Sequence, residues 1–228
     1  MNILIISSNK AFLFLKIKKM EESEPKMEKS LEKDEEKVPL NRSWSFWENY
    51  ESKNHEEKNY SKLLKEIFTF NDLIPFWQFW NKYPGSDAKQ IFYNGEQIKY
   101  FFKDKYRIIA MNLFEKGIKP EWEDNKNKGG NVLILEYIIN EELEQFLNIV
   151  NKSWIKLMCY LIGETLPHSE FVNGVRFVDK TKTNKIKNIV FKFEVWANSS
   201  LEPKKLDELK EFLSKDFGCP SVDIRKIS

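Results

Sequence analysis

The sequence predicts an α+β fold, an antiparallel β-sheet with helices packed on one face. Short segments rich in aromatic and β-branched residues alternate with longer amphipathic segments, and the links between them are short enough for hairpins. The chain has 228 residues, of which 41% are apolar and 14% aromatic, enough for one hydrophobic core. These observations favour a single domain of mixed architecture.

The N-terminal segment is expected to lie outside this domain. Residues 20–37 are almost wholly charged or polar, which predicts a disordered arm, so we place the arm at 1–37 and the domain at 38–228. The apolar runs within residues 1–20 are too short to span a bilayer, and they lack the charge order of a signal peptide. A removed or misassigned leader and a short helix both remain open for these residues.

The first half of the domain predicts two strands followed by a helix. Trp44–Tyr50 and Lys62–Phe70 have the composition of strands. Asn71-Asp72 is an N-cap signal, and the helix should run to Tyr83 with Pro75 in its first turn. Apolar residues follow at helical spacing: Leu73, Ile74, Phe76, Trp77 and Trp80.

Residues 84–120 allow two interpretations. Ile91–Tyr93, Tyr100–Phe102 and Tyr106–Ile109 could be strands, or they could belong to a partly ordered insertion. Asn131–Ile139, in contrast, is strongly typical of a strand.

The second half predicts two helices and a strand pair. One apolar stripe predicts a long core helix over Glu141–Ile162 that ends at Gly163. Val172–Asp179 and Ile186–Trp196 are predicted to form a strand pair joined by a polar turn. A last helix is expected over Pro203–Phe217, and its inward residues would be Leu206, Leu209, Phe212, Leu213 and Phe217.

Composition argues against several classes of function. The formal net charge is only +2, whereas a protein that grips long nucleic acid by its phosphates usually has a stronger basic excess. The two Cys and two His have no metal-ligand spacing, and no glycine-rich phosphate loop is present. Both His lie in polar, loop-like sequence, so they are poor candidates for catalysis. We therefore expect binding without catalysis, no metal and no cofactor.

The segment GIKPEWEDNKNKGG carries the most specific chemistry. Trp122 either plugs the core or is displayed for a ligand, and Glu123 stands beside it. A guanine methylated at N7 is a flat cation, which an indole attracts by stacking and cation–π contact. Its N1–H and exocyclic amine suit one carboxylate. Trp122 and Glu123 offer both halves of this recognition.

The whole region from Val38 onward resembles the eukaryotic translation initiation factor 4E family. The resemblance is carried by PLNRSWSFW, the Phe76-Trp77 pair, PEWEDNKNKGG, CYLIGE and the late Trp196. It implies a curved antiparallel sheet backed on its convex face by about three helices, with a cap-binding slot on the concave side. It also implies a cytoplasmic, monomeric protein that binds the 7-methylguanosine cap of mRNA and has no membrane association.

The same resemblance suggests roles for particular residues. The second stacking ring would be Tyr60, which lies 17 residues before Trp77, and Glu123 would read the edge of the base. Trp196 would touch the N7 methyl group, or it is plain core, and Tyr60 could be an ordinary surface tyrosine. Phosphates would be held by basic residues of the late hairpin: Lys180 and Lys192 first, then Lys182, Lys187 and Arg176. These could also be no more than a solvated turn.

Two departures from the family pattern concern the rim of the slot. Asn131-Val132 stands where the family has Arg-Trp, and the stretch between Tyr83 and Phe114 is longer than usual. We keep open the alternative of an interaction protein with weak or lost cap binding. A decapping hydrolase is the remaining competitor, but the Glu141-Glu142-Glu144 cluster is typical of an acidic first helical turn.

A dorsal apolar patch is the second surface that the resemblance implies. It would receive the helix of a scaffold of the initiation factor 4G type or of a 4E-binding repressor. Its residues would be Val38, Pro39, Leu73, Trp77, Ile155 and Cys159, although Trp77 could instead be buried core. Lys156 stands where the family has an acidic residue, so the partner motif differs or one salt bridge is missing.

Overall fold

The computed structural model describes residues 37–52, 60–92, 105–139, 142–181, 189–219 and 221–228. All of them belong to one unit that begins at Lys37. The predictions for the N-terminal arm and for Tyr100–Phe102 therefore lie outside the described residues, and so does the turn over residues 182–188.

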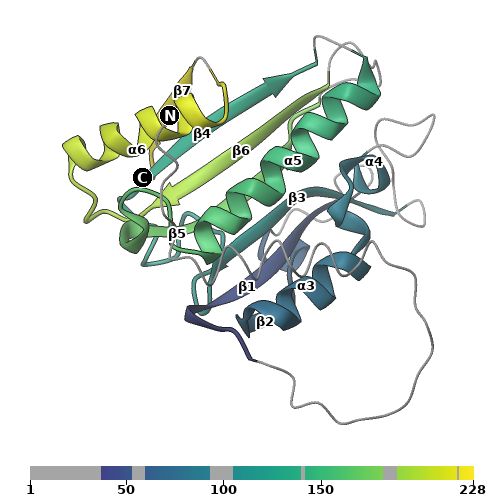
Figure 1. Cartoon of the computed structure of the whole chain (residues 1–228), viewed down its shortest axis with the longest axis horizontal. Coiled ribbons are helices and arrows are strands. Elements are labelled where there is room, and N and C mark those ends of the chain that lie inside the picture. Colours follow the sequence, from purple (N-terminus) through teal and green to yellow (C-terminus); the bar gives the residue numbers. More distant parts are fainter. Residues whose placement is uncertain (1–36, 53–59, 93–104, 140–141, 182–188, 220) are drawn as a thin grey trace. The chain divides into compact units, whose positions relative to one another are not determined.

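A single sheet of seven antiparallel strands forms the centre of this unit (Figure 1). Its order is β2-β1-β3-β5-β6-β4-β7. The strands are β1 (Pro39–Ser52), β2 (Leu64–Asp72), β3 (Tyr106–Glu115), β4 (Asn131–Ile138), β5 (Val172–Asp179), β6 (Val190–Ala197) and β7 (Val222–Lys226).

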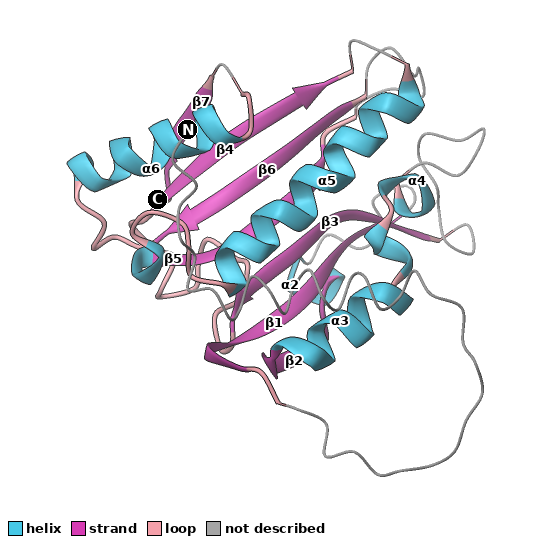
Figure 2. Cartoon of the chain, viewed as in Figure 1, coloured by secondary structure: helices cyan, strands magenta, loops and turns pink. Residues whose placement is uncertain are grey.

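Three longer helices cover one face of the sheet: α3 (Leu73–Lys82), α5 (Leu143–Ile162) and α6 (Pro203–Asp216) (Figure 1). Two four-residue helices, α2 (Tyr60–Leu63) and α4 (Ala88–Ile91), and two 3₁₀ turns complete the described elements. Figure 2 shows α2 behind the sheet, on the side away from the longer helices. The predicted α+β class, with about three helices on one face, is confirmed.

Helix α3 begins where the sequence predicts. The Asp72 side chain accepts a hydrogen bond from the backbone N–H of Ile74 at 2.9 Å, so it caps one of the unpaired donors of the first turn. Pro75 lies within that turn, where its missing N–H costs little. Leu73, Phe76 and Trp80 are buried against the sheet.

Helix α5 packs on alternate residues of the central strands. The ring of Trp154 lies 5.7 Å from that of Phe177 on β5 and 5.9 Å from that of Phe193 on β6. Side chains of a strand alternate between its two faces, so Arg176 and Val178 must point away from α5. The opposite face of the sheet is therefore where β5 presents polar chemistry.

Several predicted elements differ from the structure. Strand β2 begins at Leu64, and Tyr60–Leu63 form α2, so the predicted strand from Lys62 starts two residues too early. Ile91 ends α4 and is not in a strand, whereas Tyr106 does begin β3. Helix α6 ends at Asp216, one residue before the predicted end. Of the residues predicted to face inward, Leu209 and Leu213 are buried, while Leu206, Phe212 and the capping residue Phe217 are half-buried.

The last strand, β7, was not predicted. It pairs with β4 and completes one edge of the sheet, and Val222 at its start is buried. Within the part of the chain that the structure describes, no helix is long and apolar enough to cross a membrane.

Candidate ligand-binding site

The loop between β3 and β4 displays Trp122 to solvent. The indole is 58% exposed, and the neighbouring Glu123 is exposed too, whereas Pro120 is buried. The interpretation of this tryptophan as a core plug is therefore wrong, and its display for a ligand stays a prediction.

Side-chain hydrogen bonds within the loop hold this display in place. Asp124 accepts from the backbone N–H groups of Lys119 and Lys126, both at 2.9 Å. The Asn127 side chain, which is fully buried, donates to the carbonyls of Lys119 at 2.8 Å and Glu121 at 2.9 Å. Because the backbone on both sides of Trp122 is fixed, the ring is preorganised.

The base of the loop is tied to the sheet. The Asn173 side chain donates to Asn127 Oδ1 at 2.9 Å. A Cβ at Gly130 would lie 2.2 Å from the carbonyl oxygen of Ala197, so only glycine fits there. The backbones of Gly130 and Ile227 also pair, since Ile227 N donates to the Gly130 carbonyl at 2.9 Å. The chain's last residues thus support the loop.

A cavity of about 580 Å³ lies next to Trp122, on the face of the sheet opposite α5. Its lining residues come from α2, β3, the Trp122 loop and β5: Ser61, Ile109, Ala110, Pro120, Glu121, Trp122, Glu123, Arg176, Val178 and Lys180. The two carboxylates both belong to the loop, and the two cations belong to β5 and its end. The cavity therefore has an acidic side and a basic side.

Arg176 is held rigidly in this cavity. Its Nε donates to Asn112 Oδ1 at 2.7 Å, and Nη1 pairs with Glu194 Oε2 at 3.2 Å. The guanidinium also lies 5.3 Å from the centre of the Trp196 ring. Charge, hydrogen bonds and stacking together fix its orientation, which the sequence could not predict because the partners lie on two other strands, β3 and β6.

Helix α2 forms the wall facing the loop. Ser61 Oγ donates to Glu121 Oε1 at 3.0 Å, so the segment that begins with Tyr60 is attached beside Trp122. The side chain of Tyr60 lies outside what the structure describes. The backbone arrangement puts this residue next to the cavity, while its stacking role stays a prediction.

Trp196 is part of the core. It is 1% exposed and packs in a buried cluster with Phe114, Ile118, Val132, Ile134 and Ile227. Its Nε1 donates to Glu194 Oε2 at 3.1 Å. Trp196 therefore has the surroundings of a core residue, and its contact with the N7 methyl group of a ligand stays a prediction.

The basic residues expected to hold phosphate fall into three groups. Lys180 is exposed and lines the cavity, and Arg176 lines it while paired with Glu194. Lys192 instead forms an ion pair with Glu136 at 2.5 Å and does not line the cavity. Lys182 and Lys187 lie outside the described residues.

The residues expected to face a protein partner lie around α3 and α5. The backbone N–H of Leu73 donates to the Val38 carbonyl at 3.0 Å, and Pro39 pairs with Asp72, so the start of β1 lies beside α3. Leu73 is buried, whereas Val38, Trp77, Ile155 and Cys159 are half-buried and Pro39 is exposed. Burial raises the pKa of the Cys159 thiol to about 12, which makes it a poor nucleophile.

Lys156 is engaged within the protein. Its Nζ pairs with Asp216 Oδ2 at 2.8 Å and lies 4.9 Å from the centre of the Phe217 ring. Its charge is thus largely matched by the C-terminal end of α6.

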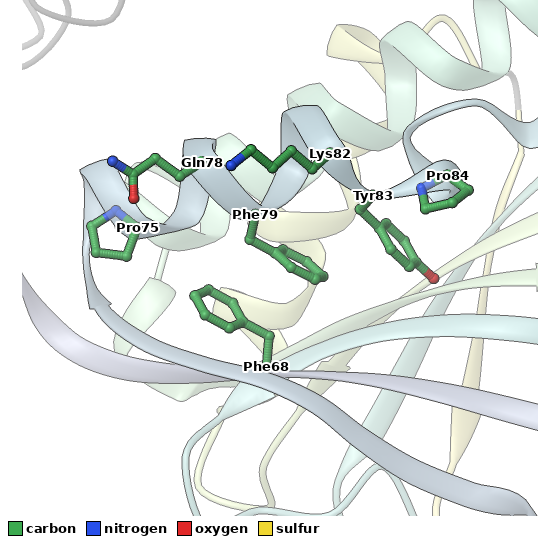
Figure 3. Close-up of a pocket in the computed structure, with 7 residues that line it drawn as sticks. All are labelled: Phe68, Pro75, Gln78, Phe79, Lys82, Tyr83 and Pro84. Carbon is green, nitrogen blue, oxygen red and sulfur yellow. The ribbon is translucent and has the colours of Figure 1, made fainter.

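A second hollow, of about 440 Å³, lies along α3 on its side toward β2 (Figure 3). Aromatic rings form its floor: Phe79 stacks on Phe68 with 4.6 Å between centroids and on Tyr83 with 5.1 Å. The rest of the lining is Pro75, Gln78, Lys82 and Pro84. The hollow lacks the opposed charges of the first cavity.

Sequence reasoning missed several residues of the site. Ser61 and Glu121 had no role assigned, and neither did Asn127 or Asn173, although Asp and Asn near glycine are typical of structured turns. Nothing in the sequence links Asn173 to a loop 46 residues earlier. Within the described ranges, no group of three or more His, Cys, Asp or Glu side chains could hold a metal ion.

Comparison with known sequences gives one family. Residues 39–224 match the family model described as Eukaryotic initiation factor 4E. The Eukaryotic translation initiation factor 4E of Candida albicans is 28% identical over 180 residues, covering 78% of this chain and 73% of that protein. The factor of the same name from Dictyostelium discoideum is 24% identical over 185 residues, or 78% of this chain and 60% of its own length.

Solved structures share the fold. The complex of C. elegans eIF4E-3 with the 4E-binding protein Mextli superposes with a TM-score of 0.62 at 18% identity, covering 83% of this chain and 93% of that one. Ascaris suum eIF4E-3 with m7G cap gives a TM-score of 0.59 at 19% identity, covering 84% and 92%. Both have the same arrangement of sheet and helices.

Proposed function

Because this chain belongs to the eukaryotic initiation factor 4E family, we propose that it binds the 7-methylguanosine cap of messenger RNA and acts in translation initiation. The proposed activity is binding without catalysis, and its place is the cytoplasm. The solved structures of similar proteins with m7G cap or with the 4E-binding protein Mextli support both a cap site and a partner surface.

One observation carries the proposal: the cavity beside Trp122 has carboxylates on one side and cations on the other. A 7-methylguanine nucleotide has the same polarity, since its base is a cation and its phosphates are anions. Glu121 and Glu123 match the base, while Arg176 and Lys180 match the phosphates. An unmethylated guanine lacks the positive charge and would be disfavoured.

The base would stack on Trp122. A cation over an indole from which water is excluded is worth about 2 kcal/mol or more, and each base–aromatic stack is worth roughly 1–3 kcal/mol. Tyr60, which begins the opposite wall, would supply the second ring. Tyr has less area and a weaker π surface than Trp, so the slot would bind less tightly than one with two indoles.

Glu123 would read the edge of the guanine. Its carboxylate can accept from N1–H and the exocyclic amine at once, a charge-assisted bidentate pair. Because Glu123 is exposed, and the side-chain hydrogen bonds described within the loop come from Asp124 and Asn127, the role of Glu123 would lie in ligand binding and not in the fold.

Phosphate oxygens would be held mainly by Lys180, with Arg176 orienting them from the floor. Lys192 is a weaker candidate than the sequence suggests, because Glu136 neutralises it. Two rings, a bidentate carboxylate and these cations, less ordering costs, sum to about −8 kcal/mol, which corresponds to about micromolar affinity.

The patch made by Val38, Pro39, Leu73, Trp77, Ile155 and Cys159 would receive a helical segment of a 4G-type scaffold or a repressor. Partial exposure of Trp77, Ile155 and Cys159 supports this. Lys156 is paired with Asp216, so we expect a partner that does not depend on an acidic residue at this position.

The decisive experiment is a titration of 7-methyl-GDP followed by tryptophan fluorescence, with GDP as the unmethylated control. We expect quenching with a Kd of about micromolar for 7-methyl-GDP and much weaker binding of GDP. Glu123→Gln should strongly weaken 7-methyl-GDP binding, because the bidentate carboxylate is lost, with little change in Tm. Absence of quenching by 7-methyl-GDP at tens of micromolar, in a correctly folded protein, would contradict cap binding and favour a role in protein interaction alone.

A further inference from the structure

Two walls of the cap cavity meet through one side-chain hydrogen bond. Ser61 Oγ of α2 donates to Glu121 Oε1 of the Trp122 loop at 3.0 Å, across 60 residues of sequence. Both residues line the cavity, and each stands directly beside a residue proposed to stack on the base. Ser61 has no role in the proposed recognition so far, and Glu121 has contributed only its negative charge.

The two walls differ in how firmly they are held. The Trp122 loop is fixed by Asp124 and Asn127. Helix α2 has only four residues, and a helix this short has almost no stability of its own in water. Its C-terminal end continues into β2, so contacts made by its first residues must set where Tyr60 stands relative to Trp122.

We propose that Ser61 and Glu121 form a clasp that sets the width of the cap slot, acting as positioning residues. The inference rests on the proposed cap binding. By holding α2 against the loop, the clasp orders both stacking segments before the ligand arrives, so less conformational entropy is lost on binding. It also engages the Glu121 carboxylate and leaves Glu123 as the one that reads the guanine.

Substitutions at both ends of the bond test the clasp. Ser61→Ala and Glu121→Ala should each weaken 7-methyl-GDP binding about three- to ten-fold, mainly through faster dissociation, since one hydrogen bond to a charged group is lost. The double variant should be no weaker than either single variant. Ser61→Thr and Glu121→Gln keep a donor and an acceptor, so they should retain most of the affinity.

Hydrogen exchange in the ligand-free protein tests the clasp independently of cap binding. In the ligand-free protein, Glu121→Ala should speed hydrogen exchange at the amides of residues 61–63 and leave Tm unchanged, because the bond is exposed. Glu123→Ala is the matched control and should not change that exchange.

The outcomes are distinct. If the wild-type chain does not bind 7-methyl-GDP, the proposed function fails, and the exchange data still decide whether the clasp exists. If the wild-type chain binds, but the Ser61 and Glu121 effects are absent or simply additive, the clasp is wrong and the proposed function stands. Unchanged exchange in Glu121→Ala likewise overturns the clasp.

Discussion

At the scale of single residues, the structure distinguishes aromatic side chains buried in the core from one that is displayed to solvent. Trp122 is 58% exposed, whereas Trp80 on α3 is 6% exposed and packs among aromatic rings. We expect the buried ring to contribute to stability, and the exposed ring, whose loop is held by hydrogen bonds, to contribute to the proposed ligand binding.

Trp122→Ala and Trp80→Ala are therefore expected to affect different properties, ligand binding and stability respectively. The first should cost roughly 1–3 kcal/mol of 7-methyl-GDP binding with little change in unfolding free energy. The second should cost about 3–5 kcal/mol of stability. Calorimetric titration and urea unfolding measure the two quantities. A large loss of stability in Trp122→Ala would contradict the displayed position of the ring.

The phenol groups of Tyr50 and Tyr83 give a second prediction at the scale of single residues. Tyr50 and Tyr83 both donate to the Glu48 carboxylate, and burial, followed by that negative charge, raises the pKa of each tyrosine well above its ordinary value. The folded state therefore holds these protons more tightly than the unfolded state. The resulting stabilisation is fully present below about pH 10 and is lost as pH rises further.

Unfolding free energy measured from about pH 8 to about pH 11 should fall at the alkaline end. Tyr83→Phe should flatten this decline, because the variant has one phenol fewer to ionise. An equally steep decline in Tyr83→Phe would show that other groups control alkaline stability.

The sequence predicted which residues are candidates for the site better than it predicted the contacts that hold them. Trp122 and Glu123 stand out because a large ring beside two carboxylates has no place in an ordinary polar loop. The constraint on Arg176 could not be read, since Asn112 and Glu194 reach it only after three strands pair. Trp196 had two open interpretations because strand alternation alone does not say what covers a face.

At the scale of elements, the Trp122 loop is the part that connects fold to function. Asn127 is fully buried and donates to two carbonyls, while Asn125 in the same loop is exposed. This contrast offers a matched pair of substitutions within three residues.

Asn127→Ala should lower stability by about 1–3 kcal/mol, because two backbone carbonyls lose their donor, and it should weaken 7-methyl-GDP binding as the loop loosens. Asn125→Ala should stay within about 0.5 kcal/mol for stability and leave affinity unchanged. Thermal unfolding and ligand titration check both. Equal behaviour of the two variants would show that Asn127 does not support the loop.

The elements predicted best were those with a local signal. Asp72 caps α3 as its sequence position indicates, and the apolar stripe of α5 gave its C-terminal end at Ile162. Helix α2 and strand β7 were missed because tertiary contacts create them: a four-residue helix has no periodicity to detect, and β7 is a short edge strand with mixed polarity.

At the scale of the whole molecule, the order of the strands in the sheet determines how the Trp122 loop is supported. Strand β4 follows β3 in sequence but lies between β6 and β7 in the sheet. The Trp122 loop therefore spans from one part of the sheet to another, and the last residues of the chain support its base through Gly130 and Ile227. The α+β class followed from local patterns, whereas this order did not, since pairing between distant strands leaves no mark on either strand alone.

Removal of residues 222–228 should therefore weaken both stability and ligand binding. Val222 and Ile227 are each buried, and the loss of two such side chains costs roughly 3–6 kcal/mol. Removal of the exposed Ser228 alone is the control and should change neither property. Urea unfolding and 7-methyl-GDP titration compare the variants. Unchanged affinity in the truncated protein would show that the Trp122 loop does not depend on residues 222–228 for its support.

The position of β4 also has a consequence for biosynthesis. A growing chain emerges from its N-terminus, so β1, β2 and β3 can associate early, while β4 has no neighbour until β6 has been made. The loop that displays Trp122 gains its full support only when Ile227 is in place. A nascent chain should therefore be unable to complete the Trp122 loop, and with it the proposed cap site, until Ile227 has emerged from the ribosome.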